Sequence, residues 1–423
     1  MKSILRHAIG IVIVLAGFSI QAQNRDLDNY RLPDQRGINV FEAPKDTIST
    51  FDGVKVRIGG ASTIQYQAID HQNSGAVGLE LKEIGYNFNL ATANLDLDVA
   101  LAPGVRMNLR TYLSSRHHPE PYVMGGYFQI DGLDFISEGF GENIMKYVTI
   151  KIGHMENNYG DAHFRRTDNA QAIYNPFVGN LIMDSFTTEV GAELYVQKDG
   201  FLGMVGFTNG KLNQAVNKTN GTTGGASFLA KLGYDKQLND DLRVRLTGSL
   251  YNTGYVQTSY LYNADRAGSR YYLVMENTAA TAAAQFRSGR YNPNLTNQIT
   301  AIMVNPFVKY KGLEFFGTIE NSAGNALGAP ERTAKQYAGE LIYRFGASEN
   351  FYVGGRYNKV EAEEASGDNI EIARTQLGAG WFMTKNILMK VEYVNQKYDG
   401  YSVGNILNDG KFKGLMAEAV ISF

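Results

Sequence analysis

Hydrophobic and polar residues alternate along much of this chain with the two-residue period of a β-strand. In VRMNLR (residues 105–110), valine, methionine and leucine take one side, and two arginines and an asparagine take the other. The same alternation recurs in LRVRLTGSLY (242–251), EVGAELYV (189–196) and the chain end GLMAEAVISF (414–423). Successive side chains of a strand point to opposite faces, so each of these strands has one apolar face and one polar or charged face.

The connections between these runs alternate in length. Tight breaks, such as the Pro-Gly at 103–104, are followed by long connections such as 154–186 and 257–298. Two connections depart from the rule, because 117–120 is short where a long one is due and 133–144 is long where a tight turn is due. Tight periplasmic turns and long outer loops are typical of outer-membrane barrels.

We therefore predict an all-β fold, a transmembrane antiparallel β-barrel of about 16 strands over residues 52–423. An open sheet edge does not persist in hydrocarbon, so the last strand must pair with the first and Phe423 joins the periplasmic aromatic girdle. A soluble β-sandwich or propeller is the alternative. In a barrel, Arg243 and Arg245 must face the lumen, since each would cost about 2–4 kcal/mol facing lipid at the bilayer midplane. The predicted strands cover residues 53–69, 81–102, 104–116, 121–132, 145–153, 187–198, 201–209, 226–237, 241–256, 299–311, 313–320, 335–346, 350–361, 370–383, 386–398 and 411–423.

The N-terminus has the pattern of an export signal. Lys2 and Arg6 precede an apolar run over residues 8–20, and Ala22 offers a small residue for cleavage. The run is too short to span a bilayer, which takes about 20 apolar residues. We predict a signal peptide over 1–22 and a periplasmic segment or small plug over 23–51.

Composition supports an exported barrel. The 423 residues include 46 glycines, 26 tyrosines and 22 phenylalanines against 9 prolines, which favours many strands and turns over helical bundles. The chain has no cysteine, so an exported fold cannot rely on disulfides. A net charge of −2 offers no basic excess, and we expect no nucleic-acid partner.

Two segments resemble a known porin family. KIGHMENNYGDAHF (151–164), followed by FTTEVGAELY (186–195), resembles a strand, loop and return strand of the phosphate-selective porin O and P family, and DGVKVRIGGASTIQYQ (52–67) is similar to its first strand. The resemblance implies a trimeric channel whose third outer loop folds into the barrel. The dense arginine ladder and lysine ring that phosphate specificity implies are missing here, so that specificity is not carried over.

Charged residues on the inward faces are the candidates for setting transport. The third-loop stretch HFRRTDN brings together His163, Arg165, Arg166 and Asp168, which we predict to form a constriction because rings of charge set selectivity in pores. The loop could instead be solvated, and the lumen charges could pair with one another rather than create a transverse field. The strand alternation predicts pore-lining side chains at Arg106, Arg110, Lys151, Glu189, Glu193, Arg243, Arg245, Glu340 and Arg344.

These features predict a porin in the outer membrane of a Gram-negative bacterium. It would be a homotrimer in the lipid bilayer, passing small hydrophilic solutes, inorganic anions among them, through a water-filled barrel narrowed by the third loop. A plugged barrel that moves a specific apolar or oligomeric substrate stays open as an alternative.

An outer-membrane barrel enzyme is the other alternative, although the chain offers little for it. The two adjacent histidines at 117–118 do not have the HExxH spacing of a zinc-binding helix. The chain also has no GxSxG motif and no P-loop motif. Asp96 and Asp98, two apart on one strand, are more typical of solvated lumen charges than of a calcium site. We expect no enzyme and no cofactor. The alanine-rich run 279–286 predicts a short helix within 257–298, either in the lumen or outside.

Overall fold

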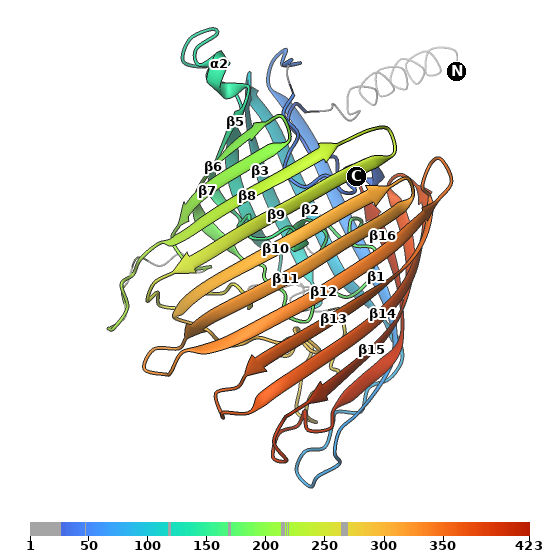
Figure 1. The fold of residues 1–423 in the computed structure, drawn as a ribbon. Coiled ribbons are helices and arrows are strands. Elements are labelled where there is room, and N and C mark those ends of the chain that lie inside the picture. The colour runs from blue at the N-terminus through green and yellow to red at the C-terminus, as the bar shows by residue number, and fades with distance from the viewer. Residues whose placement is uncertain are drawn as a thin grey trace, which may run out of the picture.

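The computed structural model describes residues 27–46, 48–116, 120–167, 171–212, 216, 218, 220–263 and 270–423. The predicted signal peptide and Asp168 lie outside these residues. Sixteen antiparallel strands form one closed barrel in which β1 pairs with both β2 and β16 (Figure 1). The predicted fold class and strand number are confirmed. The strands are β1 (Lys55–Gln72), β2 (Asn87–Ala102), β3 (Val105–Ser114), β4 (Tyr122–Ile130), β5 (Val148–Glu156), β6 (Thr188–Lys198), β7 (Phe201–Thr208), β8 (Ser227–Gln237), β9 (Leu242–Thr253), β10 (Gln298–Tyr310), β11 (Leu313–Asn325), β12 (Arg332–Phe345), β13 (Phe351–Glu363), β14 (Asn369–Thr384), β15 (Ile387–Asp399) and β16 (Lys411–Ser422).

The last strand closes the barrel against the first. Ala61 lies opposite Ser422 in the β1–β16 register. One residue further, Gly60 and Phe423 exchange two backbone hydrogen bonds of 3.0 Å each. These bonds satisfy backbone groups that would otherwise be unpaired at the membrane.

The outer face of the barrel is apolar. On β12, Tyr343 and Phe345 are exposed on the outer face. Arg344 between them is buried in the lumen, as is Glu340 earlier on the same strand. Pairs of aromatic rings lie on the outer wall near the periplasmic strand ends. One such pair is Phe351 and Trp381, whose rings stack with their centroids 5.5 Å apart. The alternation in the sequence thus separates a lipid face from a lumen face. No helix in the described residues is long and apolar enough to cross a membrane.

Short helices occur only at the ends and inside of the barrel among the described residues. They are η1 (Gln35–Gly37), η2 (Ala162–Phe164) and α2 (Glu142–Met145), the last in the long periplasmic connection between β4 and β5. The helix predicted over 279–286 was wrong, because this run forms turns. Thr281 and Asn277 hold these turns by accepting bonds from nearby amides, a local alternative to helix that outweighs the weak preference of alanine.

The third outer loop, residues 157–187 (loop 3), lies inside the barrel. Of its described residues, all but Ala162, Phe164 and Gln171 are buried. Its backbone amides bind side chains of the opposite wall. The amide of Val178 donates to Glu392 on β15 at 2.8 Å, that of Ile182 to Asn358 on β13 at 2.7 Å and that of Met183 to Gln336 on β12 at 2.9 Å. Loop 3 therefore crosses the barrel from β5 and β6 to β12, β13 and β15.

Two other segments share the lumen with loop 3. The connection over 254–297 (loop 5, described except for 264–269) joins it through the amide of Tyr291, which donates to the carbonyl of Ile182 at 2.8 Å. Tyr159, Ile182 and Met183 of loop 3 pack with loop 5 and the wall in a buried apolar cluster. On the periplasmic side, residues 27–46 (the N-terminal segment) insert Phe41 against Phe307 and Phe316 of the wall. Among the described residues, these three segments pack inside the barrel, and they narrow the predicted water-filled lumen.

Candidate functional site

A cavity of about 190 Å³, here called the chamber, lies between the N-terminal segment, loop 3 and the inner faces of β2 to β6. Its lining includes Thr188, the first residue of β6, and Gln197, the residue before the last. On β5 the lining runs from Thr149 to Glu156. The chamber therefore follows these strands along nearly their whole length.

Strand register places the charges of the chamber. Arg106 lies opposite Gln129, Gln129 opposite Lys151, and Lys151 opposite Glu193, so these four residues form one row across β3 to β6. Side chains in one such row point to the same face of the sheet. Arg106 and Lys151 consequently face the chamber, as the sequence alternation predicted.

The acidic side chains that line the chamber are already paired. Asp96 forms an ion pair with Arg110 on β3. Asp98 accepts hydrogen bonds from Asn108 at 2.8 Å and from the Tyr30 hydroxyl at 2.9 Å, and its carboxylate lies 3.6 Å from Arg57. Each of these carboxylates therefore already has cationic or hydrogen-bonding partners within the protein.

Two further lining acids have the same character. Glu156 contacts Nδ1 of His163 at 2.7 Å, and the other ring nitrogen of His163 lies 3.0 Å from Asn158. Glu42 of the N-terminal segment pairs with Arg245 at 2.8 Å and with Lys231 at 3.3 Å. His163 is the predicted constriction residue that does line the chamber.

Three cations of the chamber have no carboxylate partner among the residues that the structure describes. Lys151 lies over the rings of Tyr127 and Tyr195. Arg106 donates to Gln129 Oε1 at 2.7 Å and to a backbone carbonyl of the N-terminal segment at 3.2 Å. Arg31 donates to two backbone carbonyls, at 3.0 and 3.1 Å. The lining holds four carboxylates and four arginine or lysine side chains, but three of these cations form no ion pair with a carboxylate of the described residues.

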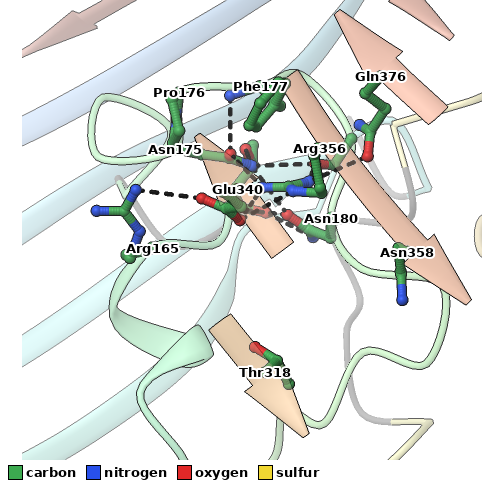
Figure 2. Close-up of polar contacts among 12 residues, drawn as sticks. Arg165, Asn175, Pro176, Phe177, Asn180, Thr318, Glu340, Arg356, Asn358 and Gln376 are labelled. Atoms are coloured by element: carbon green, nitrogen blue, oxygen red, sulfur yellow. Dashed lines mark hydrogen bonds and ion pairs between the residues drawn. The ribbon is translucent and has the colours of Figure 1, made fainter. Parts of the chain in front are cut away.

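Arg165 and Arg166, the other predicted constriction residues, lie outside the chamber lining. Arg165 pairs with Glu340 on β12 at 3.1 Å, and Glu340 in turn pairs with Arg356 on β13 at 2.8 Å (Figure 2). Arg166 forms a bidentate pair with Asp184 at the other end of loop 3. Both arginines hold loop 3 in place rather than facing open space.

The remaining predicted lining residues fall into two groups. Glu189 accepts hydrogen bonds from Thr208 and Tyr251, and Glu193 accepts one from the amide of Asn158, so both are buried partners inside the packed lumen. Arg243 and Arg344 line a second cavity of about 630 Å³ among the periplasmic turns, where each is paired, with Asp235 and Glu314 respectively.

A cluster of four charged residues, here called the latch, connects the N-terminal segment and loop 3 to the wall of the barrel. Arg245 on β9 contacts Asp161 of loop 3 at 2.7 Å and Glu42 at 2.8 Å, and Lys231 on β8 reaches Asp161 at 2.8 Å. Burial alone would raise the pKa of Glu42, but Arg245 and Lys231 beside it lower that pKa to about 2. The same two cations hold the pKa of Asp161 well below its usual range against the opposite effect of burial.

The sequence analysis missed several lumen residues that anchor the inserted segments. Lys390 on β15 donates to three loop 3 carbonyls and pairs with Glu418 on β16. Its signal was available, because Lys390 lies between Met389 and Val391 in an alternating run. Other inward charges outside the predicted set include Lys231, Glu320, Arg356, Arg374 and Glu418. Within the described residues, no cluster of three or more histidine or acidic side chains is placed to hold a metal ion.

Solved structures with a similar fold are outer-membrane porins and channels. The anion-selective porin from Comamonas acidovorans aligns with a TM-score of 0.54 at 11% identity, over 88% of this chain and 99% of that one. OmpF of Salmonella typhi, in complex with daunomycin, aligns with a TM-score of 0.51 at 10% identity, over 88% and 98%. The channel DcaP of Acinetobacter baumannii aligns with a TM-score of 0.50 at 11% identity, over 89% and 99%. No family model and no curated protein sequence matches the chain.

This chain has the porin fold. A closed barrel with an apolar outer face and that fold is a protein of the outer membrane of a Gram-negative bacterium. At these identities the likeness concerns the fold, and membership of the phosphate-selective porin O and P family stays a prediction. In this porin-fold barrel, inserted segments pack the lumen and the chamber lies to one side, beside β2 to β6.

Proposed function

We propose that this porin-fold barrel is a channel for passive diffusion of small hydrophilic solutes, with anions favoured, and that the path follows the chamber beside β2 to β6. The observation that carries the proposal is the pairing of charges in the chamber. Its acids are paired within the protein, whereas Lys151, Arg106 and Arg31 have no carboxylate partner among the described residues. Assembly as a homotrimer is part of the proposal.

The physical argument concerns what an entering ion must displace. An anion beside Lys151 or Arg106 forms a new favourable contact without breaking a protein ion pair. A cation meets carboxylates that already have partners: Arg110, Arg57 and Arg245 offset the charges of Asp96, Asp98 and Glu42, and Glu156 contacts His163. Charges lining a narrow pore act at close quarters, so we expect this difference in pairing to set ion preference.

Replacing both Lys151 and Arg106 with glutamine is expected to shift the channel toward cations. One unit charge at about 4 Å in water contributes about 1 kcal/mol, which corresponds to roughly a fivefold change in the anion-to-cation permeability ratio for each charge removed. The measurement is the reversal potential in a potassium chloride gradient across a planar bilayer.

Arg243→Gln provides the matched control, since it removes one lumen charge that is paired with Asp235 and lies outside the chamber. We expect this variant to keep the wild-type reversal potential. An equal shift in Arg243→Gln, or no shift in the double variant, would show that the path does not follow the chamber.

A plugged transporter is a second candidate, favoured by the filling of the lumen by the N-terminal segment and loop 3. In that case the N-terminal segment must move for transport, whereas the chamber path needs no such movement. The amide of Gln35 donates to the carbonyl of Lys385 at 2.8 Å, so these two residues are suited to an engineered disulfide in a chain without cysteine.

Oxidation of the Gln35→Cys, Lys385→Cys variant is expected to leave the unitary conductance unchanged. The lock fixes the N-terminal segment to the β14–β15 turn, which the chamber path tolerates. Single-cysteine variants and recovery with a reducing agent control for oxidation itself. A conductance that disappears on oxidation and returns on reduction would favour the plugged transporter.

A further inference from the structure

We propose that the chamber binds organic anions that carry an aromatic ring, with aromatic carboxylates as the preferred solute class. This inference rests on the proposed function and names the solute of the same path. It comes from the partners of the three cations that lack carboxylates, because each of them lies against a tyrosine ring.

In each of these pairs, the cation lies within 6 Å of the centre of a tyrosine ring. Lys151 Nζ lies 4.9 Å from the ring centroid of Tyr127 and 5.8 Å from that of Tyr195. The Arg31 guanidinium carbon lies 3.7 Å from the Tyr174 centroid. The Arg106 guanidinium carbon lies 5.4 Å from the centroid of Tyr30. All four distances fall within the range of cation–π contacts.

A tyrosine ring, unlike a carboxylate, leaves the charge of the neighbouring cation available to a bound anion. The ring attracts the cation through its quadrupole but carries no net charge, so the charge of the cation is held in place without being neutralised. An anion can therefore still pair with Lys151 or Arg106. The same rings present carbon surface to the chamber, against which a second aromatic ring can pack edge-to-face or offset-stacked.

The wall and the inserted segments both supply these contacts. Of the three cations, Arg106 on β3 and Lys151 on β5 belong to the wall, and Arg31 belongs to the N-terminal segment. The inserted segments contribute Phe41 and Phe164, and Met124 and Met155 of the wall add apolar surface. A solute with a carboxylate at one end and a flat apolar body can use both the charges and the apolar surface, whereas chloride or acetate uses the charges alone.

The test compares three monovalent carboxylates as blockers of the potassium chloride current through single channels at constant ionic strength. Benzoate is expected to reach half-block at about twofold to twelvefold lower concentration than cyclohexanecarboxylate, the range for one aromatic pair beyond the burial of apolar area. Cyclohexanecarboxylate, similar in size but not aromatic, is expected to fall between benzoate and acetate, because its ring buries apolar surface without the aromatic contact. Calorimetric titration of the detergent-solubilised protein must give the same order of affinities and does not depend on conduction.

Variants separate the ring from the charge. Tyr127→Leu is expected to lose most of the preference for benzoate and to keep the preference for chloride over potassium, whereas Tyr127→Phe keeps both. Lys151→Gln is expected to weaken both. Tyr357→Leu removes a tyrosine from the lipid face of β13 and should change neither.

The outcomes separate this inference from the proposed function. Equal block by benzoate and acetate, or equal block by benzoate and cyclohexanecarboxylate, in a channel that still prefers chloride overturns the inference and leaves the proposed function standing. A wild-type channel without anion preference overturns the proposed function itself. Loss of benzoate preference in Tyr127→Leu together with its retention in Tyr127→Phe supports the aromatic contact.

Discussion

Replacement of Arg245 with methionine is expected to destabilise the packing of the lumen by about 3–5 kcal/mol, the usual cost of removing one partner from a buried ion pair. Arg245 contacts both Asp161 and Glu42, and the substitution leaves Lys231 to balance these two buried carboxylates. We expect faster hydrogen exchange at residues 39–44 and 160–164 of the folded barrel in detergent, measured by mass spectrometry.

Lys309→Met is the matched control, because Lys309 lies on the neighbouring strand β10 and its ion pair is with Glu349, outside the latch. This pair is partly exposed, with side-chain exposures of 26% and 32%, so its loss should cost less than about 1 kcal/mol. Unchanged exchange in Arg245→Met, or the same increase in both variants, would mean that the latch does not hold the inserted segments.

The barrel could be predicted because the sequence features that specify it lie within single strands and turns. Each strand has a two-residue period, each turn has its own polar or glycine residues, and the bilayer imposes closure. This reasoning assigns Arg106 and Lys151 to the inward face, because the parity of a side chain depends only on its own strand, and in the structure both line the chamber. The same parity marks Lys390 and Glu418, which a complete count of each alternating run would have found.

The contents of the lumen could not be predicted because its contacts are not local. Loop 3 has no repeating pattern. The amide of its residue Val178 donates to Glu392, which lies 214 residues further along the chain. Sequence reasoning recognised Arg165 as a cation but could not tell a free cation from a paired one, since its partner Glu340 lies 175 residues along the chain. The distinction matters for function, because a paired arginine anchors a loop and an unpaired one attracts an anion.

Replacement of Lys390 with methionine is expected to release the tip of loop 3 from the wall. The Lys390 ammonium is 2% exposed and donates to the carbonyls of Ala172, Asn175 and Phe177 at 3.0 to 3.1 Å. Its removal leaves these carbonyls and the carboxylate of Glu418 without their cation, at a cost of about 3–5 kcal/mol. Hydrogen exchange at residues 172–178 and the noise of the open-channel current report the loosening.

A second substitution determines how much of this cost is electrostatic. Adding Glu418→Gln to Lys390→Met removes the unpaired buried charge, so the double variant should recover part of the lost protection even though the carbonyls stay unpaired. Lys397→Met, an exposed lysine of the same strand, should stay within about 0.5 kcal/mol of the wild type. A double variant as unprotected as Lys390→Met would assign the anchoring to the carbonyl contacts alone, and a wild-type exchange pattern in both would mean that loop 3 is held elsewhere, for example through Glu340 and Arg356.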